Sequence, residues 1–358
     1  MLKVSAYFQC LEQEIIILII DANIYWLPNE IFVSEKMTNH FLRVIPREYG
    51  VYAYQREKEK NKREFVIEKP EGSENLNYFQ GDYDLSAQLQ NMDQAGVDIG
   101  IMKLPGCQEW LDLDLCIQFN NQMAETVKKS NGRFRALAVV PPSGDADSLR
   151  ELKRCINELH MNGLQLSAHY GNKYLDDPMF RPLLRCANDL NIPVYIHHTP
   201  VPVEYNSLTD YNNLRRSYGR CEDQTIAVTR EIFSGMFKDL PNLKMIHSML
   251  GGGYFAYKNM FFPNDSGNGR FDAGSLDVAR SLKNNIYFEM SHAQPWGKAE
   301  LKCAVEVLGA DHIIYGSSYP VKKDWLIGGP QYVNSLPISQ DEKDMLLFKN
   351  AERIYGIK

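Results

Sequence analysis

The chain has 358 residues, of which 44% are hydrophobic and 23% are charged, and its formal net charge is −6. These values are ordinary for a globular protein, and the length suits one large α/β barrel. No basic block is present, which argues against nucleic-acid binding, and no apolar run is long enough to cross a membrane. The seven cysteines show no CxxC spacing, so we expect reduced thiols in a cytoplasmic protein.

Short apolar runs alternate with longer helical patterns along most of the chain. The first run, residues 15–21, indicates a buried parallel strand that leads into an Asn-Ile-Tyr segment. Further strands are predicted at residues 97–104, 134–140, 163–168, 193–198, 243–248, 285–291 and 313–316. Because each strand is followed by enough residues for a crossover, these eight βα units predict an α/β fold, a TIM-type (β/α)8 barrel.

Two long segments interrupt this alternation, residues 29–82 after the first strand and residues 199–225 after the fifth. Both follow the C-terminal end of a strand, which is the face where barrel enzymes place their chemistry. Loops of this length in a compact domain are usually functional or cover a site. We therefore expect one domain, residues 1–358, with both insertions over the C-terminal face of the barrel.

Eight short stretches, in order along the chain, are similar to segments of the amidohydrolase-related (amidohydrolase-2) family. They are residues 92–98, 131–134, 139–141, 174–178, 192–197, 250–253, 315–320 and 350–351. That family comprises TIM-barrel decarboxylases and hydratases of aromatic or unsaturated carboxylic acids, together with lactonases and other hydrolases. The resemblance implies an enzyme, either a hydrolase or a carbon–carbon lyase.

The resemblance also implies where a metal would bind. Most members hold one divalent ion with His-x-His after strand 1, a His on strand 5 and an Asp on strand 8, and a further His after strand 6 handles protons. In this chain the strand-5 position keeps its residue, His197, and the other four positions carry Asn23, Tyr25, Met249 and Ser318. Because these replacements are poor substitutes for imidazole and carboxylate ligands, we expect a degenerate metal site and no cofactor.

Histidines gather near the predicted strand ends, at His169, His197, His198, His247 and His292. Any one of them is more often a hydrogen-bonded structural residue than a catalyst, but a glutamate inside a barrel, Glu289, needs a partner. We predict that His197, His247 and Glu289 are the catalytic acid–base groups. In an alternative, His169 joins these three residues around a relocated divalent metal such as Zn.

The substrate-binding residues are predicted from their places near the same strand ends. Arg216 lies among several tyrosines in the second insertion, and a guanidinium can bind a carboxylate with two hydrogen bonds. The equally weighted alternative for this insertion is a surface loop held by aromatic packing. The predicted set is Asn23, Tyr25, Lys103, His169, Arg216, His292 and Ser318.

These features predict a hydrolase or lyase that acts on a small cyclic or unsaturated carboxylic acid or enol. Its chemistry would be acid–base catalysis without the usual metal. The alternative is a non-catalytic paralogue that binds a ligand or partners an active amidohydrolase. We expect a homodimer, or in that alternative a pairing with the active paralogue.

Overall fold

The computed structural model describes residues 18–46, 51–68, 71–199, 202–204, 206–208, 210–261 and 276–357. Eight parallel strands form its centre, and each coincides with a predicted strand or overlaps it. They are β1 (Ile20–Tyr25), β5 (Ile99–Lys103), β6 (Phe134–Ala136), β7 (Leu164–Ser167), β10 (Pro193–His197), β11 (Lys244–His247), β12 (Ile286–Glu289) and β13 (Ile313–Ile314).

Backbone pairing closes these strands into a barrel. β1, β5 and β6 pair in one sheet, and β7, β10, β11, β12 and β13 pair in a second. A parallel bridge between Ala138 and Leu164 joins the two sheets on one side, and a bridge between Ile24 and Tyr319 joins them on the other. The predicted TIM-type (β/α)8 barrel is therefore confirmed.

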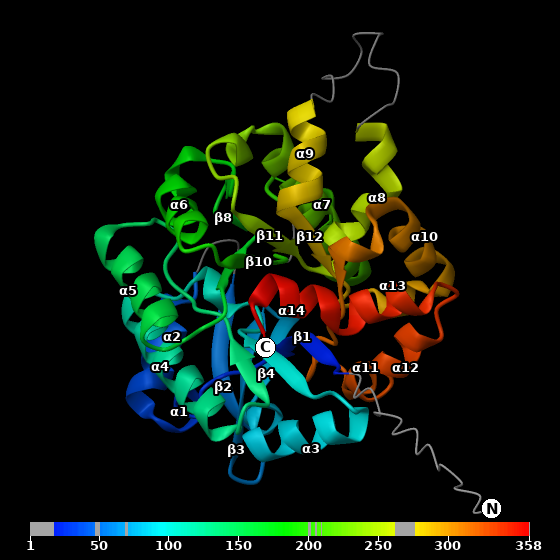
Figure 1. Cartoon of the computed structure of the whole chain (residues 1–358). Coiled ribbons are helices and arrows are strands. Elements are labelled where there is room, and N and C mark those ends of the chain that lie inside the picture. Colours follow the sequence, from blue (N-terminus) through cyan, green and yellow to red (C-terminus); the bar gives the residue numbers. More distant parts are fainter. Residues whose placement is uncertain are drawn as a thin grey trace, which may run out of the picture.

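Helices surround the strands (Figure 1). Asp84, Asp112 and Asp145 each cap the helix that follows by accepting backbone N–H bonds with the side chain, which fixes three of the helix starts. These helices are α3 (Leu85–Ala95), α4 (Leu113–Lys129), α5 (Ala146–Asn157), α6 (Arg181–Asp189), α7 (Gly219–Phe233), α8 (Met249–Phe261), α9 (Leu276–Asn285), α10 (Lys298–Leu308), α11 (Lys323–Ile327), α12 (Gly329–Asn334), α13 (Gln340–Asp344) and α14 (Asn350–Tyr355).

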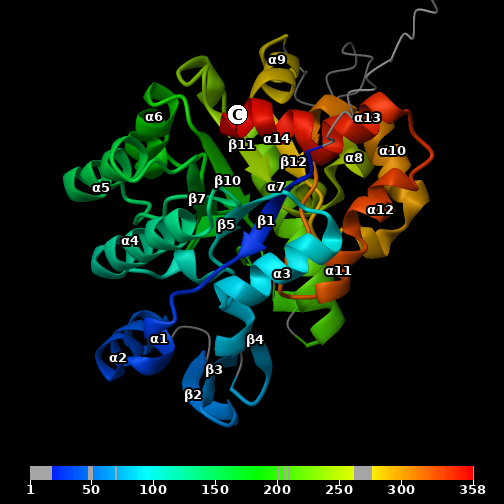
Figure 2. The same ribbon diagram turned by 60° about the horizontal axis from the view of Figure 1, so that its bottom comes forward.

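The first insertion folds into a small unit at one end of the barrel. Helices α1 (Glu30–Val33) and α2 (Glu35–Val44) precede an antiparallel sheet of β2 (Tyr52–Glu59), β3 (Lys62–Glu68) and β4 (Glu74–Phe79). Figure 2 shows this sheet below the barrel, beside α1 and α2. The rings of Phe41 and Phe65 lie 5.0 Å apart, so α2 and the sheet share an aromatic core. A short ribbon of β8 (His169–Tyr170) and β9 (Lys173–Tyr174) follows β7.

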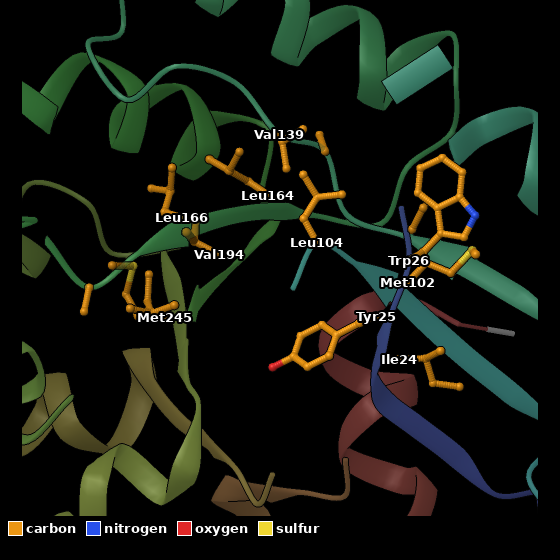
Figure 3. Packing of buried hydrophobic residues seen from close by; sticks show 14 of the residues in the cluster. Ile24, Tyr25, Trp26, Met102, Leu104, Val139, Leu164, Leu166, Val194 and Met245 are labelled. Atoms are coloured by element: carbon orange, nitrogen blue, oxygen red, sulfur yellow. The ribbon is translucent and has the colours of Figure 1, made fainter. Parts of the chain in front are cut away.

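Along each strand, successive side chains point alternately to the inside and to the outside of the barrel wall. Figure 3 shows the neighbours Ile24 and Tyr25 pointing to opposite sides of β1. Met245 belongs to the large hydrophobic core that includes many helix residues. A smaller core contains its neighbour on β11, Ile246, and residues from five other strands, among them Tyr195, Tyr287 and Ile314.

The first strand lies further along the chain than predicted. β1 spans Ile20–Tyr25, so Asn23 and Tyr25 stand on the strand and not after it; residues 15–17 of the prediction lie outside the described residues. The apolar run alone suggested an earlier end, but backbone pairing continues, since the Tyr25 N–H donates to the Tyr319 carbonyl at 2.7 Å. Across the described ranges, no helix combines the length and apolar character needed to cross a membrane.

Candidate active site

A cavity of about 400 Å³ opens at the C-terminal ends of the strands. Tyr25 ends β1, His197 ends β10, and His292 follows β12. The first insertion and the start of α7 supply further walls. The described lining residues are Tyr25, Glu74, Leu76, Asn77, Tyr78, Asp82, Tyr83, Pro105, Gly106, Glu109, His197, His198, Arg216, Arg220, His292, Pro320 and Val321.

Tyr25 and His197 form a hydrogen-bonded pair on this cavity. The Tyr25 Oη and His197 Nε2 atoms lie 3.1 Å apart, and His197 Nδ1 lies 2.7 Å from the carbonyl oxygen of His198. Because a carbonyl only accepts, Nδ1 carries the ring proton, and Nε2 accepts from the Tyr25 hydroxyl. Burial, together with nearby Arg220, lowers the pKa of His197 to about 3, and burial and Glu289 raise the pKa of Tyr25. At neutral pH the imidazole is neutral and the phenol is protonated.

Two arginines give the cavity a positive wall. Arg220 lies in the first turn of α7, is 9% exposed, and leaves its buried Nε atom without a hydrogen-bond partner. Burial, reinforced by Arg216, lowers the pKa of Arg220 to about 10. Arg216 stands four residues earlier in a π-helical segment (Leu214–Tyr218) that runs into α7. In the part of the chain that the structure describes, neither arginine forms an ion pair with a carboxylate, so both remain available to an anion.

Two more histidines, His198 and His292, line the same cavity. His198 stacks on His197 with ring centroids 4.2 Å apart, and its Nδ1 lies 3.3 Å from Ser248 Oγ. His292 meets His198 edge-on at 5.5 Å and Trp325 at 4.9 Å. Its imidazole makes no hydrogen bond to a described residue, and burial followed by the Arg220 charge lowers the pKa of His292 to about 3. A bound anion would counteract the effect of the Arg220 charge on the pKa of His292.

A second set of polar side chains lies inside the barrel but does not line the cavity. Asn23 Nδ2 lies 3.0 Å from Glu289 Oε2, 3.1 Å from Tyr195 Oη and 3.2 Å from Ser318 Oγ. The Tyr195 hydroxyl also donates to Glu289 Oε2 at 3.0 Å. Burial raises the pKa of Glu289, against the attraction of Lys103. Glu289, Asn23 and Ser318 therefore form one hydrogen-bonded cluster.

Lys103 and Gly316 complete this buried cluster. The Lys103 Nζ atom sits 3.1 Å from the centre of the Tyr195 ring and has no hydrogen-bond partner, and burial lowers its pKa to about 7. A β-carbon at Gly316 would come within 1.9 Å of Glu289 Oε1. The glycine in the Tyr-Gly-Ser-Ser segment is therefore required to make room for the buried carboxylate.

The structure does not bring His247 to the cavity, so the three residues predicted to be catalytic, His197, His247 and Glu289, do not face one space. His247 Nδ1 lies 2.9 Å from Gln224 Oε1, and its Nε2 lies 2.8 Å from Glu231 Oε2. Both partners belong to α7, outside the strands. The reason is the phase of β11, in which Ile246 packs with the inner residues, so that His247 points outward.

His169 also lies away from the cavity. Its Nε2 lies 2.8 Å from Thr199 Oγ1 and 3.4 Å from Asp223 Oδ1, and its Nδ1 lies 3.1 Å from the Gly171 carbonyl. The relocated metal site of His169, His197, His247 and Glu289 is therefore wrong, because these side chains occupy separate surroundings. Within the described ranges, no group of three or more His, Cys, Asp or Glu side chains could hold a metal ion.

The donors at the family's metal positions do not fit a divalent ion. His197 directs Nδ1 to a carbonyl and Nε2 to the Tyr25 hydroxyl, and Asn23 donates Nδ2 to Glu289 and its neighbours, which leaves the buried Asn23 Oδ1 as a lone neutral oxygen without a hydrogen-bond partner. We therefore assign no chemical step to a metal.

Two cavity residues, Arg220 and His198, were absent from the predicted site. Arg220 could have been found from its spacing, since residues four apart on a helix share a face and Arg216 was already selected. Strict alternation along the strand would turn His198 away from His197 and toward the barrel wall. The strand ends at His197, however, so alternation no longer applies at His198. Tyr78 and Tyr83 carried no sequence signal, because only folding of the first insertion brings them here.

The known proteins that resemble this chain include several decarboxylases. The sequence is 26% identical over 281 residues to 2-amino-3-carboxymuconate-6-semialdehyde decarboxylase of Dictyostelium discoideum, covering 77% of each chain. The structure resembles 5-carboxyvanillate decarboxylase from Sphingomonas paucimobilis, with a TM-score of 0.75 and 22% identity over 96% of this chain and 100% of the other. It also resembles a dihydroxybenzoic acid decarboxylase from Polaromonas sp. JS666 with bound manganese and 2-nitroresorcinol, with a TM-score of 0.71 and 18% identity over 95% and 97%.

The prediction of no cofactor is corrected by the manganese ion bound in structures that resemble this one. Structures with this fold were crystallised with that ion, so the comparisons point to a divalent metal, and the prediction is wrong. The prediction considered only the family's ligand positions, where the donors of this chain do not fit a divalent ion, whereas Mn²⁺ also accepts carboxylate, carbonyl and water oxygens.

The prediction of an enzyme is confirmed by relatives that are decarboxylases, and therefore lyases; the hydrolase half of that prediction stays a prediction. The sequence model of the Amidohydrolase family (Amidohydro_2) matches residues 109–357, more than two thirds of the chain. Together with the barrel and the cavity at its C-terminal face, this match establishes that the chain belongs to the amidohydrolase family.

Proposed function

We propose that the protein is a lyase that removes a carboxyl group from a small aromatic or unsaturated carboxylic acid. The observation that carries this proposal is Arg220, a buried guanidinium that lines the cavity without a carboxylate partner among the described residues. A buried charge is costly unless it is paired, and a substrate carboxylate would supply the pair. The decarboxylase relatives support the same reaction class.

The reaction requires one proton. The bond between the substrate carbon and the carboxyl carbon breaks, carbon dioxide leaves, and the electron pair stays on the substrate carbon until that carbon takes up the proton. We assign proton delivery to His197, whose Nε2 takes up a proton from solvent when the anionic substrate binds and then gives it to the substrate carbon, because Nδ1 is held by the His198 carbonyl and Nε2 faces Tyr25 at the cavity. A bound anion favours the protonated imidazole and offsets the repulsion from Arg220.

The other groups position the reactants. Arg216 adds a second cation near Arg220, and the rings of Tyr78 and Tyr83 offer walls for a planar ligand. Glu289 lies below the cavity and acts through Tyr25, whose pKa it helps to raise and whose hydroxyl it keeps protonated. Glu289 is therefore proposed as a positioning residue.

The proposal is tested by measuring carbon dioxide release from a panel of acids. The panel includes 5-carboxyvanillate, 2,6-dihydroxybenzoate and 2-amino-3-carboxymuconate-6-semialdehyde, and each is assayed as the purified protein stands and again after addition of Mn²⁺. Release from at least one acid, lost in an Arg220→Met variant that stays folded, supports the assignment. Release that is equally fast in that variant contradicts it.

A further inference from the structure

The cavity carries charges of opposite sign on two walls. The cations Arg216 and Arg220 come from the segment that follows β10. Glu74, Asp82 and Glu109 come from segments that follow β1 and β5. In the closed strand order, β1 and β5 are neighbours, and β10 lies across the barrel from β1. A ligand that spans the cavity therefore meets cations at one end and carboxylates at the other.

Asp82 is the carboxylate of the acidic wall whose charge is not already paired. Glu74 is held by Arg56 Nη1 at 3.0 Å and by Asn77 Nδ2 at 2.7 Å. The half-buried Asp82 side chain, in contrast, forms no hydrogen bond or ion pair with a described residue. Burial raises the pKa of Asp82 to about 6, which leaves the group mainly ionised at neutral pH. Lys58 and Lys62 attract this carboxylate from a distance, but their ion pairs are with Glu64 and Glu59, so Asp82 can still pair with a ligand in the cavity.

Aromatic side chains connect the two walls. Tyr78 interacts electrostatically with Arg220 and with Glu109, and Tyr83 interacts with Asp82. The tyrosine rings suit a flat, unsaturated body, and the charged walls suit groups at its two ends. Arg220 is nine-tenths buried with an unpartnered Nε, which marks the cationic end as a ligand site independently of the acids.

We propose that the substrate carries a cationic nitrogen in addition to its carboxylate, and that Asp82 is the specificity residue that binds this nitrogen. The inference rests on the proposed function only in assigning the carboxylate to Arg220. A cavity with an unpaired carboxylate favours the ligand that pairs with it and rejects an analogue of equal shape that lacks the cation.

The test uses three meta-substituted benzoates that differ in one group. 3-(Aminomethyl)benzoate carries an ammonium, 3-ethylbenzoate has the same shape without charge, and 3-(hydroxymethyl)benzoate offers a neutral donor. Titration calorimetry on the full chain should give at least about ten-fold tighter binding of the aminomethyl compound than of the ethyl compound, as expected for a charge-assisted hydrogen bond. The hydroxymethyl compound should bind less tightly than the ammonium.

Variants separate this inference from the proposed function. Asp82→Asn should remove most of the preference for the aminomethyl compound and leave 3-ethylbenzoate binding within about two-fold. Glu71→Gln, at an exposed position outside the cavity, changes the net charge equally and should leave the preference intact. Arg220→Met should weaken the binding of all three compounds.

Three results would overturn the role of Asp82: no preference for the ammonium in the unmodified protein, an equal loss in Asp82→Asn and Glu71→Gln, or no binding of the aminomethyl compound at millimolar concentrations. If Asp82→Asn changes nothing while Arg220→Met weakens all three ligands, the cation site fails and the carboxylate site stands.

Discussion

Two buried histidines on neighbouring strands have opposite surroundings. His197 ends β10 and His247 ends β11, and these strands pair side by side. His197 lines the cavity, and its Nε2 meets a hydroxyl that also faces the cavity. His247 has both ring nitrogens bound to α7, to Gln224 and Glu231. The first imidazole is available to a ligand, and the second is part of the packing between a strand and a helix.

The difference teaches that a histidine at a strand end is not in itself evidence of catalysis. What separates the two is the side of the strand and the partner of each ring nitrogen. The same contrast applies to charge, because the Glu231 carboxylate has a partner in His247 through its Oε2 atom, while Arg220 has no partner in the described part of the chain.

Replacing Arg220 should have the largest effect. Arg220→Met removes the buried cation of the cavity, and we expect kcat/KM for the best acid to fall by roughly 100- to 1000-fold, as for truncation of one partner of a buried charge pair. Steady-state kinetics would measure this loss. Arg150→Met, at an exposed position on α5, is the control and should leave the kinetics unchanged. A loss below about three-fold in Arg220→Met would contradict carboxylate binding there.

Replacing His247 should affect stability and not chemistry. His247→Ala leaves the buried Glu231 carboxylate without its 2.8 Å partner, and we expect the free energy of unfolding to fall by about 3 kcal/mol. Urea denaturation would measure this change. The double variant with Glu231→Ala should recover part of the loss, because the uncompensated carboxylate is then gone. A stability equal to that of the unmodified protein would refute the outward assignment.

The depressed pKa of His197 predicts how stability depends on pH. Its folded-state value is about 3, against an ordinary value of 6.5, so the unfolded chain binds a proton between these values that the folded chain does not. Stability present above pH 6.5 is therefore lost as the pH falls toward 3, at up to ~1.4 kcal/mol per pH unit for one group. His197→Gln, which cannot titrate, should show a shallower decline in urea unfolding experiments. Equal slopes would contradict the burial of a neutral imidazole.

Removing the Tyr25 hydroxyl should have the smallest of these effects. Tyr25→Phe deletes one hydrogen bond to His197 Nε2 and keeps the ring, so we expect kcat to fall by roughly five- to ten-fold with little change in KM. The variant should also shift the limb of the pH–rate profile that reports the titration of His197, which kinetics across a range of pH would detect. A variant with an unchanged rate and pH profile would show that the pair has no part in proton delivery.

The barrel was predictable because its eight buried strands are short apolar runs, each followed by chain long enough for a crossover. Part of the cavity was predictable for the same reason, since residues at strand ends meet at one face, as His197 does. The phase of each strand was not, because Ile246 and His247 are both acceptable inside or outside until the neighbours are known. Tyr78 and Asp82 reach the cavity only through the tertiary folding of the first insertion, which no local pattern in that segment encodes.

The most direct test of the account compares His197→Gln with His247→Gln in the same assay of carbon dioxide release. Each rate is expressed per folded molecule, so that a loss of stability does not count as a loss of chemistry. The account predicts at least about 100-fold slower release for His197→Gln, as for removal of a general acid, and a rate within about three-fold of the unmodified protein for His247→Gln. Equal losses in the two variants, or a larger loss in His247→Gln, would contradict it.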